Sequence, residues 1–209
     1  MGNSKIVIID TSISNVFNVQ RAFMYFGQKT TITSNKDDIL NANKVILPGV
    51  GAFSQAMESL EKHDLIDIIK EVAENGTPIL GICLGMQILM TRSNEDGDHL
   101  GLDLIKGSVK KFDNTNQNNK FKIPHYGWSE VFKPSSNKLD SWNNTILEDL
   151  DKESLFCYFV HSYYANTDNP NHTIAQTSYG GSTFSSVIKN KNIMGCQFHP
   201  EKSSIGGLT

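Results

Sequence analysis

Two short segments carry residue types that could do covalent chemistry, and the first centres on Cys83. An apolar run, 78–82, leads to this cysteine, and glycines stand two residues before it and two residues after it. The residues that follow have the pattern of a helix start, so Cys83 is predicted at a sharp corner between a strand and a helix. Exposed N–H groups at such a corner stabilise a thiolate and the oxyanion that it forms on a carbonyl. Taken alone, the pattern favours a nucleophile and a small buried core cysteine about equally.

The second segment offers a base for such a nucleophile. His199 follows an apolar strand, 192–198, and Pro200 favours an extended conformation for the histidine before it. Glu201 then lies on the same side of the extended chain and can accept the imidazole N–H. A surface turn with incidental polar residues is the alternative for this segment alone. Because both segments lie at strand ends, together they predict a Cys83–His199–Glu201 triad.

A third segment, 47–53, also follows a strand and carries Gly49 and Gly51 on either side of Val50. A glycine-rich strand end can place a backbone N–H beside the nucleophile as a second oxyanion donor. The segment lacks the Gly-Lys-Ser/Thr ending of a phosphate-binding loop. A tight turn between strand and helix is an equally good interpretation of these residues.

The elements that must position these segments alternate between strand and helix in the first part of the chain. Strands are predicted at 5–10, 29–34, 44–48 and 77–82. Helices are predicted at 15–26 and at 53–74, the second with a break near His63. Continuous apolar strands that alternate with helices indicate an α/β fold, with a mostly parallel sheet flanked by helices on both faces.

The chain changes character after about residue 92. Polar loops are predicted at 93–101, 113–120 and 133–144, and strands at 154–161, 172–179, 183–190 and 192–198. These strands lie close together in the sequence and are joined by short turns. They predict antiparallel hairpins added to the parallel sheet, within a single domain that spans residues 1–209.

The composition excludes several classes of protein. A net charge of -3 over 209 residues gives no basic field, so nucleic acid is not expected as a partner. Three scattered cysteines fit neither a disulfide framework nor a zinc site, and no metal or cofactor is expected. The N-terminus lacks a secretory signal, and no window of about 18 apolar residues could span a membrane. A cytoplasmic enzyme without membrane contact is the resulting prediction.

The three segments, in this order, resemble the class I (triad) glutamine amidotransferases. The likeness is strongest to glutaminase subunits of imidazole glycerol phosphate synthases, which share Met86 in "GICLGMQ". The segments that carry this resemblance are 101–112, 122–131, 158–165 and 197–203, so it runs nearly from end to end. It implies a flavodoxin-like, mostly parallel sheet and the hydrolysis of L-glutamine to glutamate and ammonia.

The resemblance also assigns roles to residues. Cys83 would attack the side-chain amide of glutamine, His199 would serve as acid and then as base, and Glu201 would hold the imidazole. The oxyanion would lie against the backbone of Gly49, Val50, Gly51 and Leu84. Contacts to glutamine would come from Gln87, Ser162 and Tyr163.

A partner is implied as well. Family members form a heterodimer with a (β/α)8 cyclase, which receives the ammonia and makes imidazole glycerol phosphate and AICAR in histidine biosynthesis. The matching docking residues are Asn15, His125, Tyr126 and Trp128, the last three in a loop that begins at Pro124. Trp128 is predicted to be a half-exposed anchor, and a core tryptophan is the alternative.

Some positions depart from the family pattern. Thr11, Ser12 and Ser14 replace a tyrosine and two glycines in the first turn, and Tyr126 and Ser129 replace a common methionine and asparagine. The chain ends soon after the triad, where relatives continue into a closing helix, so exposed apolar surface is expected.

Three alternatives follow. An amidotransferase subunit could supply ammonia to a barrel partner that makes amidino sugars of bacterial surface glycans. A non-catalytic α/β scaffold or regulatory subunit is the alternative from another class, and the intact Cys83, His199 and Glu201 argue against it. A stand-alone cysteine hydrolase would need no partner for a substantial rate.

Overall fold

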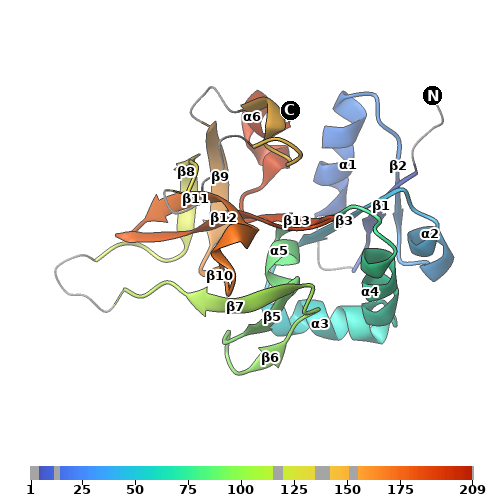
Figure 1. The fold of residues 1–209 in the computed structure, drawn as a ribbon, viewed down its shortest axis with the longest axis horizontal. Coiled ribbons are helices and arrows are strands. Elements are labelled where there is room, and N and C mark those ends of the chain that lie inside the picture. The colour runs from blue at the N-terminus through green and yellow to red at the C-terminus, as the bar shows by residue number, and fades with distance from the viewer. Residues whose placement is uncertain (1–4, 12–14, 115–119, 135–141, 151–154, 209) are drawn as a thin grey trace.

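The central sheet of the molecule is mostly parallel. The structure, a computed structural model, describes residues 5–11, 15–114, 120–134, 142–150 and 155–208. In this part of the chain the sheet has seven strands in the order β11-β12-β13-β4-β3-β1-β2. Its parallel strands are β1 (Ile6–Ile9), β2 (Thr30–Thr33), β3 (Lys44–Gly49), β4 (Ile79–Cys83) and β13 (Ile193–Cys196). An antiparallel hairpin, β11 (Thr173–Tyr179) and β12 (Ser182–Asn190), extends the sheet beyond β13 (Figure 1).

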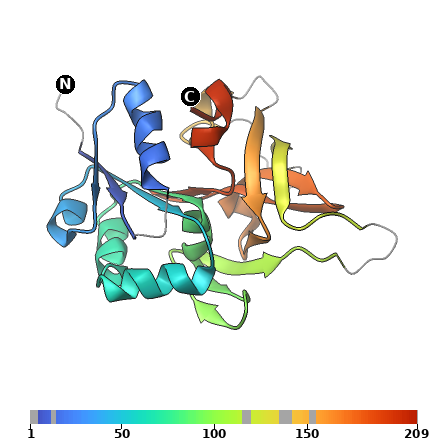
Figure 2. The same ribbon diagram turned by 180° about the vertical axis from the view of Figure 1, so that it is seen from behind.

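Helices cover both faces of the parallel strands. One face carries α1 (Val16–Tyr25), and the other carries α2 (Lys36–Leu40), α3 (Phe53–Lys62) and α4 (Ile66–Glu74). Side chains alternate along β1, so Ile6 and Ile8 pack in the cluster that contains α1 while Val7 and Ile9 pack in the cluster that contains α2–α4. Figures 1 and 2 show α1 on the opposite side of the sheet from α3 and α4. Burial on both faces explains why the strand reads as a continuous apolar run.

Two smaller sheets lie at the hairpin end of the molecule. One has the order β10-β7-β5-β6, and the other pairs β8 with β9. Their strands are β5 (Met90–Ser93), β6 (His99–Leu100), β7 (Ile105–Lys111), β8 (His125–Val131), β9 (Leu155–His161) and β10 (Tyr163–Thr167). The remaining helices are α5 (Leu84–Ile88) and α6 (Ser204–Leu208), and the 3-10 turns are Glu148–Leu150, Pro170–His172 and Pro200–Lys202. Only Ser162 separates β9 from β10, so one segment joins the two small sheets.

The predicted fold class is confirmed, and so is the break near His63, because α3 ends at Lys62 and α4 begins at Ile66. One local prediction was wrong. The segment that begins at Pro124 is not a loop throughout, since β8 starts at His125 and pairs antiparallel with β9. The alternation that marks a half-buried strand was hidden there because the outward-facing residues are aromatic. The short helix α2 and the strands β5–β7 and β10 were also not predicted.

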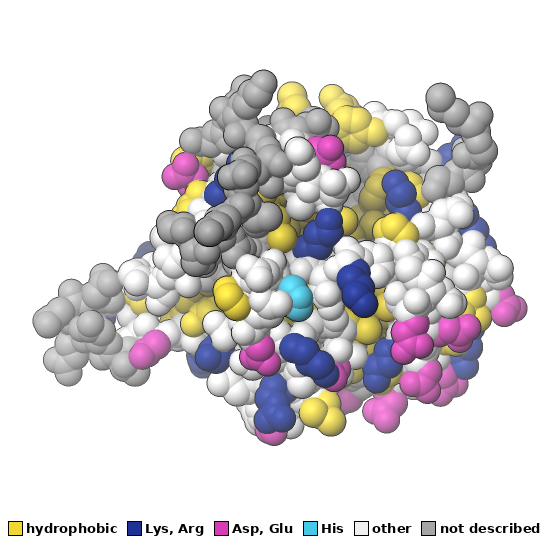
Figure 3. All heavy atoms as spheres, viewed as in Figure 1, with side chains coloured by type: hydrophobic (Ala, Val, Ile, Leu, Met, Phe, Trp, Pro, Cys, Tyr) yellow, Lys and Arg dark blue, Asp and Glu magenta, His cyan; other side chains and the backbone are white. Residues whose placement is uncertain are grey.

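The surface of the molecule mixes charges of both signs. On the face seen in Figure 3, basic and acidic side chains are interspersed over the lower part, and hydrophobic side chains reach the surface at the top, near α1 and α6. None of the described helices is long and apolar enough to cross a membrane.

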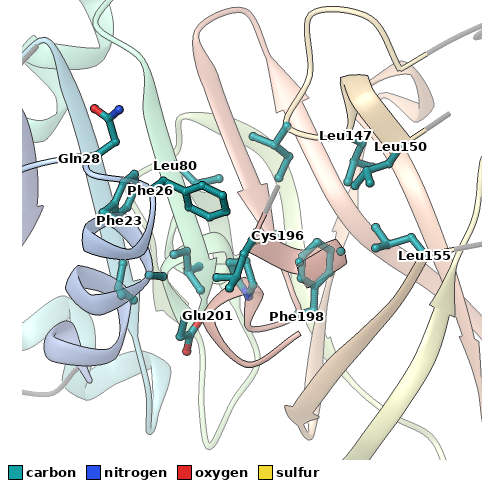
Figure 4. A pocket seen from close by; sticks show the side chains of 18 residues that line it. Phe23, Phe26, Gln28, Leu80, Leu147, Leu150, Leu155, Cys196, Phe198 and Glu201 are labelled. Carbon is teal, nitrogen blue, oxygen red and sulfur yellow. The ribbon is translucent and has the colours of Figure 1, made fainter. Parts of the chain in front are cut away.

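An apolar pocket of about 260 Å³ opens beside α6. In Figure 4, Phe23 of α1 and Phe26, which follows that helix, line one side, Leu147 and Leu150 line the other, and Cys196 lies between them. Burial raises the pKa of the Cys196 thiol well above its ordinary value, so this sulfur stays protonated. The pocket therefore offers packing surface and no nucleophile.

Among the described glycines, the tightest backbone contact lies at Gly85, where α5 meets β3, and it leads to a first prediction. A Cβ added to Gly85 would lie 1.7 Å from the carbonyl oxygen of Leu47. Gly85→Ala should therefore lower the free energy of unfolding by about 3 kcal/mol or more, because backbone would have to move.

Gly27→Ala is the control. Gly27 has a φ of 70° but no atom within 4 Å of the added carbon, so only about 1 kcal/mol of backbone strain is expected. Urea unfolding followed by circular dichroism measures both, and equal losses would contradict the packing argument.

Candidate active site

Cys83 occupies a strained corner between β4 and α5. Its φ of 55° and ψ of −110° lie in a region that residues with a Cβ rarely adopt, at a cost of roughly 1–3 kcal/mol. Close packing holds the corner, because a Cβ on Gly81 would lie 2.6 Å from the carbonyl oxygen of Gly85. The two glycines therefore allow α5 to turn back tightly over the end of β4. Gly49 of β3 lies directly opposite Cys83 in the sheet.

The Cys83 side chain lines a pocket of about 330 Å³ at the carboxyl ends of the parallel strands. Several residues that the sequence analysis selected share this pocket with it: Val50, Gly51, Leu84, Gln87, Ser162, Tyr163 and His199. They come from the turn after β3, from α5, from the junction of β9 and β10, and from the segment after β13. The fold thus gathers at one cavity residues that are far apart in the sequence.

His199 and Glu201 form a buried pair at this pocket. His199 has an extended conformation, with a φ of −98° and a ψ of 96°, as the following proline predicts. Its Nδ1 atom lies 2.8 Å from Oε1 of Glu201, and both side chains are buried. The second carboxylate oxygen of Glu201 is buried without a hydrogen-bond partner among the described residues. The imidazole of His199 is therefore the main group that stabilises the buried carboxylate of Glu201.

The charges around His199 favour its protonated form. Burial lowers the pKa of His199, but the Cys83 thiolate and the Glu201 carboxylate raise it by more, to about 10. The Nε2 atom of His199 is buried without a hydrogen-bond partner among the described residues, and the nearby sulfur of Cys83 favours the protonated imidazole. Near neutral pH the site therefore holds an imidazolium next to a sulfur that can carry a negative charge.

Glu95 also lines the pocket, and the sequence analysis missed it. Its Oε2 atom accepts a hydrogen bond of 2.7 Å from the backbone N–H of Phe53, the first residue of α3. Ala52, which precedes that helix, has no side chain that could cap it. Glu95 thus caps α3 from a distant loop. The sequence gives no signal for this role, because Glu95 stands in a polar segment with other acids.

A second pair of histidines lies beside the pocket. Nδ1 of His125 is 3.1 Å from Nε2 of His161, and the His125 ring stacks between Phe159 and Tyr179. Burial lowers the pKa of His125 to about 4 and that of His161 to about 3, so both are neutral at pH 7. Two histidines alone do not make a metal site, and the described part of the chain gathers no group of three or more His, Cys, Asp or Glu side chains that could hold one.

The burial of His125 corrects one docking prediction. Its side chain is only 1% exposed, so it cannot contact a partner as predicted. The reason is the alternation along β8, which turns His125 inward and Tyr126 and Trp128 outward.

The other docking residues are on the surface. Trp128 is 52% exposed, so it is not a core tryptophan, and Tyr126 is also exposed. The ring of Tyr158 on β9 meets both of these rings edge to face. Asn15 is exposed and caps α1 by accepting a hydrogen bond from the N–H of Asn18. Ser12 and Ser14 of the first turn lie outside the described residues.

Comparisons with known proteins identify the family of this chain. The family model described as "Glutamine amidotransferase class-I" matches residues 7–206. The imidazole glycerol phosphate synthase subunit HisH 1 of Legionella pneumophila (strain Paris) is 43% identical over 207 residues, which cover 99% of this chain and 96% of that protein. Subunit HisH of the same synthase from Sulfurimonas denitrificans is 44% identical over 203 residues, which cover 97% of this chain and 93% of that protein.

Solved structures share the fold at low sequence identity. A crystal structure of a glutamine amidotransferase superposes with a TM-score of 0.71 at 13% identity and covers 97% of this chain and 94% of that chain. The structure of PurLQS from Thermotoga maritima gives a TM-score of 0.66 at 19% identity and covers 96% of this chain and 89% of that chain.

The pairing of His199 with Glu201 leads to a second prediction. Glu201→Gln removes the anion that stabilises the imidazolium, so the pKa of His199 should fall from about 10 by roughly 1–3 units. The imidazolium would then be lost at a lower pH than in the wild type. Imidazole resonances followed by NMR across the pH range measure this shift.

Glu95→Gln is the matched control, because it removes a carboxylate from the same pocket without a hydrogen bond to His199. It should leave the titration of His199 close to that of the wild type. An unchanged titration in Glu201→Gln would show that the carboxylate does not set the charge of the imidazole.

Proposed function

The chain belongs to the class I glutamine amidotransferase family, and from this premise we propose that it is the glutaminase subunit of an imidazole glycerol phosphate synthase. It hydrolyses L-glutamine to glutamate and ammonia within one amidotransferase domain and passes the ammonia to a (β/α)8 cyclase subunit. That partner makes imidazole glycerol phosphate and AICAR in histidine biosynthesis. The observation that carries the chemistry is the pocket where Cys83 meets a histidine held by Glu201. The two bacterial relatives support the choice of synthase.

In the first half of the reaction, the thiolate of Cys83 attacks the side-chain carbonyl carbon of glutamine. The carbonyl π electrons move to oxygen, and the tetrahedral oxyanion lies against the Leu84 N–H and the backbone of 49–51. The oxyanion then collapses, the C–N bond breaks, and protonated His199 gives its proton to the leaving nitrogen. Ammonia and a γ-glutamyl thioester result. The pKa of about 10 for His199 supports this order, because the imidazolium is already present when the thiolate attacks.

In the second half, neutral His199 takes a proton from a water molecule as that water attacks the thioester. The C–S bond breaks, its electron pair returns to the sulfur, and glutamate leaves. Glu201 holds Nδ1 of the imidazole throughout, so Nε2 serves as donor in one half and as acceptor in the other. The thiolate and the imidazolium are restored at the end of the cycle.

Recognition of glutamine needs an anion for its α-ammonium group, and Glu95 offers one at the pocket wall. The amide nitrogen of Gln87 is already bonded within the protein, so its free oxygen is the atom that it can offer to the substrate. Ser162 and Tyr163 close the same wall. Glutamine therefore enters with its side-chain amide toward Cys83 and its charged end toward Glu95.

The docking surface for the cyclase centres on the outer face of β8 and β9. Tyr126, Trp128 and Phe156 are large, exposed side chains on these paired strands, and Tyr158 packs against the first two. Exposed aromatic side chains of this kind anchor protein interfaces. Asn15 at the start of α1 is proposed as a further contact, and the side chain of His125 is not.

A third prediction tests the chemistry. Incubation with diazo-oxo-norleucine, a glutamine-like electrophile, should label Cys83 alone. Burial raises the pKa of the Cys157 thiol to about 12, so that cysteine stays unreactive. With the cyclase and its ligand present, Cys83→Ala should lower glutamate formation by about 10³-fold or more. Cys157→Ala, as the control, should keep most of the rate. Labelling absent under these conditions would favour the scaffold alternative.

A fourth prediction tests the docking surface and the identity of the partner. Trp128→Ala should weaken binding of the cyclase about 30-fold, because a buried interface tryptophan contributes roughly 2 kcal/mol. Leu100→Ala removes an apolar side chain that is even more exposed than Trp128. It lies on β6, at the other side of the small sheets, and its loss should leave binding unchanged (Figure 1). Calorimetric titration measures both.

The same titration with two barrel proteins separates the pathways. Tight binding and glutamine-dependent product formation with the histidine-pathway cyclase support the proposed synthase. Ammonia transfer only to a barrel protein of surface-glycan biosynthesis would assign the chain to that pathway. A high glutaminase rate without either partner would indicate a stand-alone hydrolase.

A further inference from the structure

A chain of buried hydrogen bonds ends on the reacting sulfur. We propose that the side-chain amide of Gln197 donates a hydrogen bond to the sulfur of Cys83, and that the backbone carbonyl of Tyr163 sets the direction of this bond through Gln87. This inference rests on the proposed role of Cys83 as nucleophile. It adds a residue that contacts the reacting atom to the triad.

The backbone of Gln197 is held in position by a hydrogen bond to the central sheet. It follows β13 directly, is fully buried, and donates its backbone N–H to the carbonyl of Ser186 on β12 at 2.9 Å. Its Nε2 atom lies 3.8 Å from Sγ of Cys83, within reach of a hydrogen bond to the large sulfur atom. A fully buried amide must find partners for its donors and its acceptor. The sulfur is the partner that the fold supplies for Nε2.

The direction of this bond follows from a single carbonyl group. The oxygen of Tyr163 can only accept, so the atom of Gln87 that lies 2.8 Å from it must be the amide nitrogen. The same nitrogen lies 3.1 Å from the amide of Gln197 and therefore faces the oxygen of that amide. The nitrogen of Gln197 is then left to face the sulfur. Turning either amide around would bring two acceptors or two donors together in a buried site.

A second series of hydrogen bonds, through two histidines, also ends on the carbonyl oxygen of Tyr163. Nδ1 of His161 lies 2.8 Å from the Tyr163 oxygen and must carry the proton. Its Nε2 atom then accepts from Nδ1–H of His125 at 3.1 Å, and Nε2 of His125 accepts from the hydroxyl of Ser129 at 2.9 Å. The carbonyl thus receives two donors, which occupy both of its lone pairs. It cannot rotate without breaking one of them.

The consequence for the reaction lies in the steps where sulfur carries charge. His199 loses its proton when ammonia leaves and regains one as water attacks the thioester, so its charge changes during the cycle. The electron pair of the C–S bond must then return to sulfur, and the Gln197 amide is a neutral donor that remains in place at that step. A donor fixed before the reaction stabilises charge without reorganisation.

The test is the pH dependence of alkylation of Cys83 by iodoacetamide, followed by mass spectrometry of the peptide that contains it. Gln197→Met keeps a side chain of similar length but lacks the donor. In this variant the pH at which the rate is half maximal should rise by roughly one unit, because a hydrogen bond to a charged group is lost. A purely structural role would lower the melting temperature and leave this pH unchanged.

A second variant keeps the test decisive if Gln197→Met fails to fold. Gln87→Glu leaves Gln197 intact but turns its amide, because a carboxylate accepts from the nitrogen that otherwise faces the sulfur. The half-maximal pH should again rise. Ser186→Ala is the control, since the hydroxyl of Ser186 is buried beside the same strand without a hydrogen-bond partner among the described residues. Its profile should match that of the wild type.

The outcomes separate this inference from the proposed function. Wild-type profiles in a folded Gln197→Met and a folded Gln87→Glu would overturn the inference and leave the triad in place. Alkylation of the wild type that never reaches Cys83 at any pH would overturn both, because that sulfur would not be a nucleophile. A higher half-maximal pH of alkylation in both variants, with the value for Ser186→Ala unchanged, supports the proposed series of hydrogen bonds.

Discussion

The site depends on one constraint, the strained backbone at Cys83. Cys83 has a φ of 55° at the turn from β4 into α5, and it lines the pocket there. The conformation persists only because α5 lies so close to β3 and β4 that no Cβ fits at Gly85. The same contact brings Gly49 opposite the nucleophile. Tight packing of the sheet and the position of the sulfur are therefore a single feature of the fold.

Two buried histidines line the pocket that contains the sulfur, and their environments shift their pKa values in opposite directions. His199 has a carboxylate on one side and a thiolate on the other, so its pKa rises to about 10 in spite of burial. His161 is packed against Phe112 and Phe184, with a neutral histidine and a carbonyl as hydrogen-bond partners, and its pKa falls to about 3. One histidine holds a proton for the reaction, while the other carries a fixed tautomer that orients its neighbours. Burial lowers the pKa of both histidines, and only His199 has charged partners that outweigh it.

The sequence predicted what local patterns determine. Apolar runs located the parallel strands, and the glycines around Cys83 and the proline after His199 located two corners of the site. It could not predict what depends on contacts between distant segments. Glu95 caps a helix that begins 42 residues before it, and Gln87 meets Gln197 across 110 residues. The burial of His125 depends on the register of β8 with β9 and on stacking against Tyr179. Register and stacking of this kind have no local signature.

The two faces of β8 have different contacts. Tyr126 and Trp128 point outward, and His125 and Ser129, one residue along, point inward to the histidine pair. The inner face of β8 reaches the Tyr163 carbonyl through the hydrogen bonds of His125 and His161. That carbonyl also orients Gln87, whose amide faces the amide of Gln197 next to the sulfur. An unbroken series of contacts therefore runs from β8 to the sulfur of Cys83.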